Sequence, residues 1–89
     1  MSSEKLKLLE EKFRSLFSLW VDPLKVNQLV FNFKVDERGV LMEITGPKEV
    51  LAIIIGKKGA TINAVRRIGK VIGASVGAAL SIKVNTPRG

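Results

Sequence analysis

Apolar residues in the first part of the chain recur every three or four positions, with charged residues between them. The apolar positions are Leu6, Leu9, Phe13, Leu16, Phe17 and Trp20. This spacing places them on one face of a helix, so we predict an amphipathic helix over residues 3–21 that packs on a core. Ser3 is the expected N-cap, and Asp22-Pro23 is expected to end the helix because proline cannot continue it.

From residue 26 onward the pattern changes to alternation. Leu29, Phe31, Phe33 and Val35 occupy every second position, which is typical of a strand with one buried face. Val40, Met42 and Ile44 repeat the same pattern. The residues between the two runs, Asp36-Glu37-Arg38-Gly39, are turn formers. We therefore predict an antiparallel hairpin over residues 25–45.

Two helices separated by a glycine loop are predicted over residues 47–72. Pro47 suits the first position of a short, largely buried helix that Gly56 ends. The apolar stripe of the second helix consists of Ile62, Val65, Ile68 (or Gly69) and Ile72. Small residues at 73–77 connect this helix to a last alternating strand at 79–84, and residues 85–89 are expected to form a flexible tail.

The predicted order of elements is thus α-β-β-α-α-β. A strand that is joined to a later strand through two helices crosses over right-handed and pairs in parallel. The expected fold is α+β, a three-stranded mixed sheet with three helices packed on one face. With 89 residues, the chain is expected to form a single domain over residues 1–89.

The net charge of +7 comes from one half of the chain. Residues 1–49 contain eight Lys or Arg and eight Asp or Glu, whereas residues 50–89 contain seven Lys or Arg and no acid. A surface that only confers solubility does not require this segregation. The asymmetry favours a polyanionic partner, either nucleic acid or an acidic membrane surface.

Several classes of function are disfavoured by composition. The chain has no Cys and no His, which removes the commonest metal ligands, nucleophile and general base. Its glycines match neither the P-loop nor the dinucleotide-binding fingerprint. We therefore expect a protein that is not an enzyme and that holds no metal or cofactor. The longest uncharged run, Val71 to Ile82, is 12 residues and too short to cross a bilayer, so a soluble, cytoplasmic protein is expected.

The glycine loop is the strongest candidate for chemistry. Gly56 and Gly59 bracket Lys57 and Lys58 immediately before a helix. Such a loop exposes backbone N–H groups at the positive end of the helix dipole, which favours phosphate. Along the helix, Asn63, Arg66, Arg67 and Lys70 share one polar, basic face. All five aromatic residues precede residue 34, which disfavours base stacking on aromatic rings near this site.

The segment Ile54-Ile55-Gly56-Lys57-Lys58-Gly59, within this order of elements, resembles the GXXG motif of the KH domain. The extra helix and strand at the N-terminal side resemble the type II, prokaryotic topology, and the whole chain is similar to the small single-domain bacterial KH proteins. The chain departs from them at Ala60, where these proteins often carry a basic residue.

This resemblance implies an RNA-binding site, with the glycines shaped against phosphates and the lysines contacting them. Ile54, Ile55 and Ile62 would line or support an aliphatic groove, and Lys83 would face it from the other wall. The implied RNA-binding residues are Ile55, Gly56, Lys57, Lys58, Gly59, Ala60, Thr61, Ile62, Asn63, Arg66, Arg67 and Lys83. The partner would be single-stranded RNA, of which about four nucleotides are clamped, with DNA left open.

A second interpretation is an assembly protein that pairs with itself or with another KH protein. The small-residue run from Val71 to Ile82 favours it. An acidic membrane is the least favoured partner, because the basic stripe is not accompanied by exposed aromatic residues or leucines.

Overall fold

Helix α1 (Ser3–Phe17) begins the fold in a computed structural model that describes residues 2–85. Its N-cap is Ser2 rather than the predicted Ser3, since the Ser2 hydroxyl accepts a hydrogen bond from the N–H of Lys5 at 3.3 Å. The buried face of the helix is the one that the apolar spacing predicts, with Leu9, Phe13 and Phe17 inaccessible to solvent.

The prediction that this helix reaches residue 21 is wrong. The N–H groups of Leu19 and Trp20 donate to carbonyls three residues earlier, at 3.1 and 3.2 Å, so the chain tightens into a turn after Phe17. The turn buries Val21 and leaves Trp20 41% exposed, packed edge-on against Phe17. A second short helix, α2 (Pro23–Val26), follows, and the Asp22 carboxylate caps it by accepting the N–H of Leu24 at 2.8 Å.

The hairpin begins later than the predicted residue 25, because α2 occupies the start of that range. Val26 is buried on α2, and strand β1 (Val30–Asp36) starts four residues later. The side chain of Arg14 holds this connection. Its guanidinium donates to the carbonyl oxygens of Val26 at 2.9 Å and Leu29 at 3.0 Å.

The three strands form one mixed sheet in the order β1-β2-β3. Strand β2 (Gly39–Thr45) pairs antiparallel with β1, and Phe31 lies opposite Ile44. Strand β3 (Leu80–Val84) pairs parallel with β2, which confirms the expected mixed sheet and parallel pairing. The pairing continues to Asn85, whose N–H donates to the Ile44 carbonyl at 2.9 Å, so Asn85 is not part of a free tail. The rest of the predicted tail, residues 86–89, lies outside the described residues.

Between β2 and β3 the chain forms helix α3 (Lys48–Ile55), the 3₁₀ turn η1 (Lys57–Gly59) and helix α4 (Ala60–Ser75). Helix α4 extends past the predicted end at residue 72, and its buried stripe uses Gly69 whereas Ile68 is 44% exposed. Close packing against β3 explains this choice. A Cβ on Gly69 would lie 2.7 Å from Ile82 Cδ1, and one on Gly73 would lie 2.7 Å from Leu80 Cβ.

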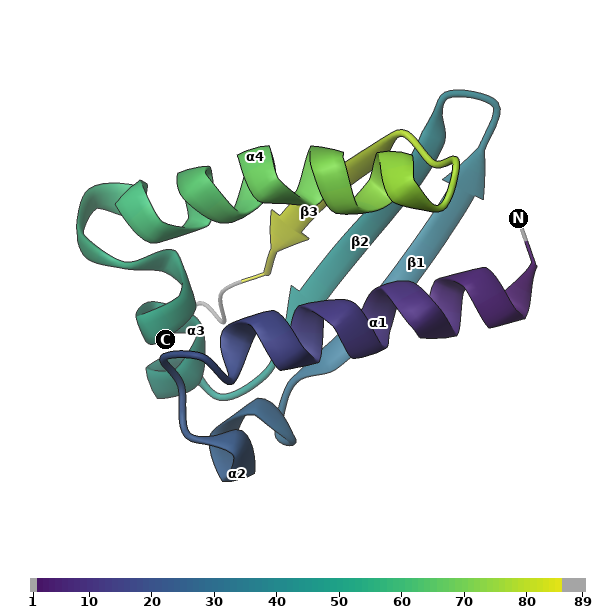
Figure 1. The fold of residues 1–89 in the computed structure, drawn as a ribbon. Coiled ribbons are helices and arrows are strands. Elements are labelled where there is room, and N and C mark those ends of the chain that lie inside the picture. Colours follow the sequence, from purple (N-terminus) through teal and green to yellow (C-terminus); the bar gives the residue numbers. More distant parts are fainter. Residues whose placement is uncertain (1, 86–89) are drawn as a thin grey trace.

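The two long helices, α1 and α4, lie side by side over one face of the sheet, and α3 lies at the end of the sheet (Figure 1). Residues 2–85 therefore contain four α-helices, not the three that were expected on one face. The opposite face of the sheet carries the exposed alternate residues of the strands, including Lys34, Ser81 and Lys83. Among the described residues, no helix is both long and apolar enough for a bilayer crossing.

Candidate nucleic-acid interface

The turn between α3 and α4 has a backbone that glycine alone accommodates without strain. Gly56 has φ 74° and ψ 176°, and a Cβ there would lie 2.2 Å from Oγ1 of Thr61. Gly59 has φ 75°, but a Cβ on it would meet only Ile62 Cγ2, at 3.9 Å. Gly56 is therefore required by both conformation and space, and Gly59 by conformation alone.

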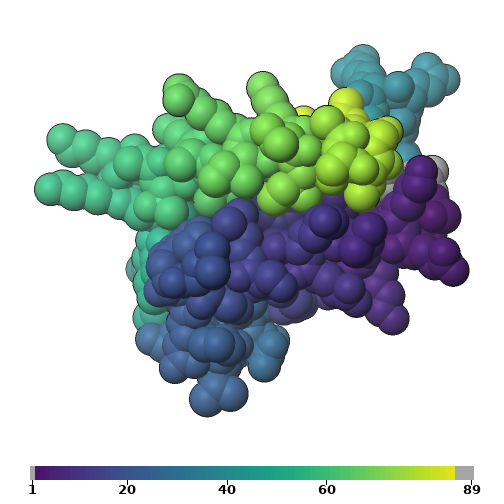
Figure 2. Space-filling view, in the orientation of Figure 1, coloured from purple at the N-terminus to yellow at the C-terminus, as the bar shows by residue number. Residues whose placement is uncertain are grey.

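The two lysines between these glycines are exposed in a tight 3₁₀ turn. The N–H of Gly59 donates to the Gly56 carbonyl at 3.2 Å, which closes the turn. Lys58 has φ 55° and ψ 25°, a left-handed conformation that costs a non-glycine residue about 1 kcal/mol or more. Figure 2 shows long side chains from the green part of the chain, which contains this turn and α4, extending away from the body of the molecule. The strained turn thus presents its two ammonium groups to solvent.

Helix α4 begins directly at the turn with no side-chain cap. Its N-cap residue, Gly59, has no side chain, and no other side chain caps this end of the helix in the described structure. The first N–H groups of a helix lack partners within the helix, and they carry the positive end of its dipole. Backbone and lysine charge therefore act at the same place, where an anion such as phosphate would be stabilised.

The predicted aliphatic residues support this turn more than they line a groove. Ile54 and Ile62 are buried in the core, and Ile55 is half-buried. Thr61 is also half-buried, because its hydroxyl lies under Gly56. The isoleucines therefore anchor the turn to the rest of the domain, and of the three only Ile55 is partly accessible to solvent.

The polar stripe of α4 divides into two parts. Arg67 is exposed and, with Ala60 and Asn63, borders a shallow hollow on the outer side of the helix. Arg66 points the other way, toward the sheet. Its Nε donates to the carbonyl oxygen of Ile82 at 3.3 Å, and its Nη1 donates to Oδ1 of Asn63 at 3.2 Å. The structure thus brings together the glycine turn, Asn63 and Arg67 on α4, and it links Arg66 to strand β3.

Lys83 does not join this group. Because side chains alternate along β3, burial of Ile82 under α4 places Lys83 on the open face of the sheet, beside Glu43 on β2. The Asn85 amide donates to Glu43 Oε2 at 2.9 Å, and Lys34 Nζ lies 2.9 Å from Oε1. Asn85 first, then Lys34 and Lys83, hold the pKa of the Glu43 carboxyl below its ordinary value. Lys83 is therefore part of an ion cluster on the open face.

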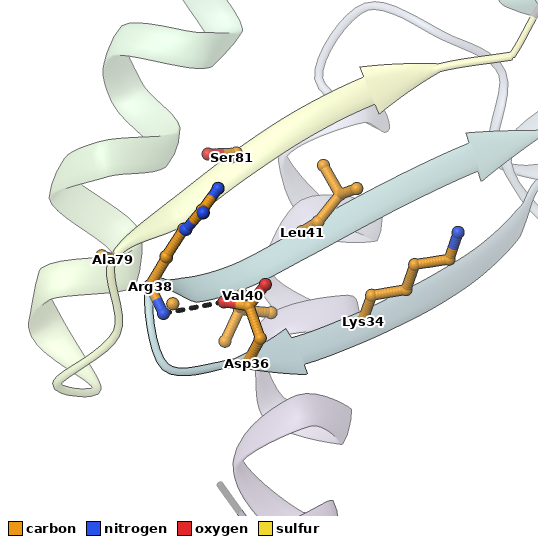
Figure 3. A pocket seen from close by; sticks show the side chains of 8 residues that line it. Lys34, Asp36, Arg38, Val40, Leu41, Ala79 and Ser81 are labelled. Atoms are coloured by element: carbon orange, nitrogen blue, oxygen red, sulfur yellow. Dashed lines mark hydrogen bonds between the residues drawn. The ribbon is translucent and has the colours of Figure 1, made fainter.

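The open face also carries a hollow that the strand pattern did not reveal. Figure 3 shows Arg38 and Lys34 extending over it on either side of Leu41, with Ser81 on the neighbouring strand. Its volume is about 300 Å³. The Asp36 carboxylate borders it and accepts the N–H of Arg38 at 2.7 Å. Strand alternation indicates that Lys34 is exposed, and Arg38 lies in the turn between β1 and β2, but only the pairing of β2 with β3 places Ser81 beside them. Asp36 and Glu43 lie on the same face as Lys34 and Arg38, so the charges around this hollow are mixed, whereas all the charged residues of α4 are basic.

No known family, curated protein or solved structure matches the chain significantly. Among the described residues, no group of three or more acidic side chains is placed to hold a metal ion.

Proposed function

We propose that this chain is a non-catalytic KH-type module, with the type II topology, that binds single-stranded RNA in the cytoplasm. The observation that carries the proposal is the glycine turn. It combines two exposed lysines, a helix start without a side-chain cap, and a contact between Gly56 and Thr61 that leaves no room for a Cβ at position 56. Two kinds of positive group thus converge where a phosphate backbone would lie, in a half of the chain without acids.

The KH assignment is supported by the elements on either side of this turn. Strand β2, helix α3, the turn, helix α4 and strand β3 follow one another, and β2 and β3 are parallel neighbours. Strand β1, on the outer side of β2, supplies the antiparallel edge that a type II arrangement adds. The short helix α2 is an addition to the expected order.

In this proposal the turn clamps the backbone of about four nucleotides, and the bases extend along α4 toward the free edge of β3. Phosphate contacts give an affinity that falls with salt and depends little on sequence. Arg67 extends the positive surface along the bound RNA, and Asn63 adds a neutral polar group beside it. RNA is the proposed ligand. Comparing its affinity with that of a DNA strand of the same sequence measures how much the 2′-hydroxyl contributes to binding.

The decisive experiment is fluorescence anisotropy of labelled single-stranded RNA with a Lys57→Asp/Lys58→Asp variant. A Lys5→Asp/Lys7→Asp variant is the matched control, because it makes the same change in charge at two exposed lysines on α1. We expect the first variant to bind at least about tenfold more weakly than the control, since it removes phosphate contacts and adds repulsion. Equal binding by both variants would show that the glycine turn is not the site.

A second candidate, self-association, is favoured by a different surface from the one the sequence suggested. The small-residue run is used inside the domain, because Gly73, Ala78 and Leu80 are buried between α4 and β3. Apolar side chains line instead a groove between α1 and α4, here called the α1–α4 groove. They are the exposed Leu8 and Leu19 and the half-buried Leu16 and Ile72.

A second copy of the chain suits this α1–α4 groove. The charged residues that line it, Glu11 and Lys12, cancel each other, so two molecules of net charge +7 would repel least there. A two-fold axis would place Glu11 of one copy near Lys12 of the other. Sedimentation of the wild type and a Leu19→Lys variant tests this: a dimer that dissociates in the variant supports it, and a wild type that is monomeric at all concentrations excludes it.

A further inference from the structure

The proposed RNA site has no aromatic ring on which a base could stack. The five aromatic residues of the chain lie on α1, in the turn after it and on β1. Three of them, Phe13, Phe17 and Phe31, are buried in the core. A base that leaves the phosphate clamp therefore needs another flat partner, and an arginine guanidinium is the other side-chain plane that proteins use for this purpose.

Arg66 is held flat and in place before any ligand arrives. Its Nε and Nη1 donate to two acceptors on different elements, the carbonyl of Ile82 on β3 and the side chain of Asn63 on α4. Two in-plane hydrogen bonds fix the orientation of a guanidinium, and they reduce the side-chain entropy that is lost when a ligand binds. Arg66 is nevertheless an exposed residue.

The same hydrogen bonds leave both faces of the guanidinium, and three of its five N–H donors, not engaged by the described residues. Since Nε is engaged by Ile82, the side-on pair of donors that phosphate or carboxylate would accept is already in use. Hydrogen bonds in the plane do not occupy the faces. Within residues 2–85, Arg14 lies over the ring of Phe31, whereas no aromatic ring covers Arg66.

The position of Arg66 suits a base rather than a phosphate. Strand β3 is an edge of the sheet, and the Ile82 carbonyl that accepts from Arg66 faces away from β2, which pairs instead through Ala79 and Asn85. The guanidinium thus bridges α4 and the free edge of β3. Asn63, to which it is bonded, lies one turn from the start of α4 and the glycine turn.

We propose that Arg66 is the stacking platform for one unpaired nucleobase of the bound strand, in place of an aromatic ring. The proposal rests on the proposed RNA-binding function and adds a base contact to its phosphate clamp. A purine presents the larger face and would be preferred there.

A double-mutant cycle between Arg66 and single bases tests this proposal. The probe is the tightest binder from a panel of labelled single-stranded RNAs about eight nucleotides long, which exceeds the four-nucleotide clamp. In derivatives of this RNA, one base at a time is replaced by an abasic nucleotide. Arg66→Lys keeps the positive charge but removes the planar guanidinium. Arg67→Lys, the same substitution at the next residue, is the matched control.

We expect Arg66→Lys to weaken binding of the intact RNA about tenfold, within the range measured for one stacked base. With the RNA that lacks the stacked base, the same variant should bind as the wild type does. A loss of affinity that is the same for every abasic RNA would mean that Arg66 acts through structure or charge, and would overturn the proposal. The loss of affinity caused by Arg67→Lys should be the same for the intact RNA and for every abasic RNA.

An Arg66→Trp variant provides an independent check, should the lysine variant be less folded. Tryptophan offers a plane without charge, so the affinity contributed by the one stacked base should be retained. Loss of that contribution in Arg66→Trp would contradict stacking. The experiments distinguish the failure of base stacking from the failure of phosphate binding by the glycine turn. If Lys57→Asp/Lys58→Asp abolishes binding, but the effect of Arg66→Lys is the same for every abasic RNA, only the stacking proposal fails. If the wild type binds no single-stranded RNA, both proposals fail.

Discussion

Gly56 and Thr61 approach each other so closely that a Cβ on Gly56 would lie 2.2 Å from Thr61 Oγ1 and 2.7 Å from Thr61 Cβ. The threonine side chain belongs to the first turn of α4, and the glycine ends α3. Contact between these two residues sets the tight connection of the two helices, and with it the exposure of the lysines between them.

The two glycines of the turn should therefore respond differently to alanine. Gly56→Ala adds a steric overlap to an unfavourable φ, and we expect it to lower the free energy of unfolding by about 2–4 kcal/mol. Gly59→Ala meets only the unfavourable φ, for which we expect about 1 kcal/mol. Urea unfolding of the two variants measures the difference, and equal losses would contradict the close packing at Gly56.

The lysines of the turn should determine part of the salt dependence of RNA binding. Each phosphate contact to a single strand contributes about 0.7 to the slope of log K against log salt concentration. A Lys57→Gln/Lys58→Gln variant should accordingly reduce the slope by about 1.4. Anisotropy titrations at several salt concentrations give the slope, with Lys5→Gln/Lys7→Gln as the control. An unchanged slope in the turn variant would exclude contact between these lysines and phosphate.

Arg14 is expected to stabilise the segment between α1 and β1. Arg14→Met removes the donors to the Val26 and Leu29 carbonyls, the ion pair with Glu10 at 3.0 Å and the contact 4.7 Å from the Phe31 ring. We expect a loss of about 2–3 kcal/mol in the free energy of unfolding. Glu10→Gln removes the partly exposed ion pair alone and should cost less than about 1 kcal/mol. If the two variants lost the same amount, the carbonyl contacts would contribute nothing.

Gly73→Ala should destabilise the protein even though alanine is the better helix former. Helix propensity alone would favour alanine by about 1 kcal/mol. The added Cβ, however, would lie 2.7 Å from Leu80 Cβ and 2.9 Å from the Ala78 carbonyl oxygen. We expect the overlap to prevail, with a net loss of about 1–2 kcal/mol in urea unfolding. A gain in stability would show that α4 can move away from β3 at little cost.

The Glu43 cluster should make stability depend on pH at the acid end. The pKa of Glu43 is lowered in the folded protein, chiefly by the Asn85 amide and Lys34, so its carboxylate favours folding when it is ionised. This contribution should be complete above the ordinary value of 4.5 and should be lost as the pH falls below it, toward the lowered pKa. The difference in thermal midpoint between wild type and Glu43→Gln should shrink over that range. A difference that does not change with pH would contradict the prediction.

Much of the backbone arrangement could be predicted from local patterns. Alternation from Phe31 to Val35 and from Val40 to Ile44 is a property of a strand with one buried face, so both strands of the hairpin were predicted near their observed positions. The parallel pairing of β3 with β2 followed from the two helices between them, because such a crossover leaves little choice of direction.

Local patterns failed where a distant residue decides the conformation. Between Trp20 and Leu29, the first residues continue the apolar spacing of α1 and the last ones already fit the alternation of β1. The pattern therefore predicts that the helix and the hairpin extend into this segment. Arg14, twelve residues before Val26, holds this segment as a separate helical turn instead. The same holds on α4, where spacing predicts Ile68, or alternatively Gly69, in the buried stripe, and the nearness of Ile82 selects Gly69.

Three features follow from the sequence alone, because they are properties of neighbouring residues and of composition: the glycine turn, its two lysines and the lack of acids beyond residue 49. Which charged side chains share a surface with that turn depends instead on the tertiary fold. Arg66 was assigned to the basic stripe by helical spacing, yet its hydrogen bond to Ile82 crosses to another element. Lys83 was assigned to the same groove, yet the alternation of β3 and its pairing with β2 place it beside Glu43. Such contacts join residues far apart in the chain, and they depend on how helix and sheet pack rather than on any local pattern.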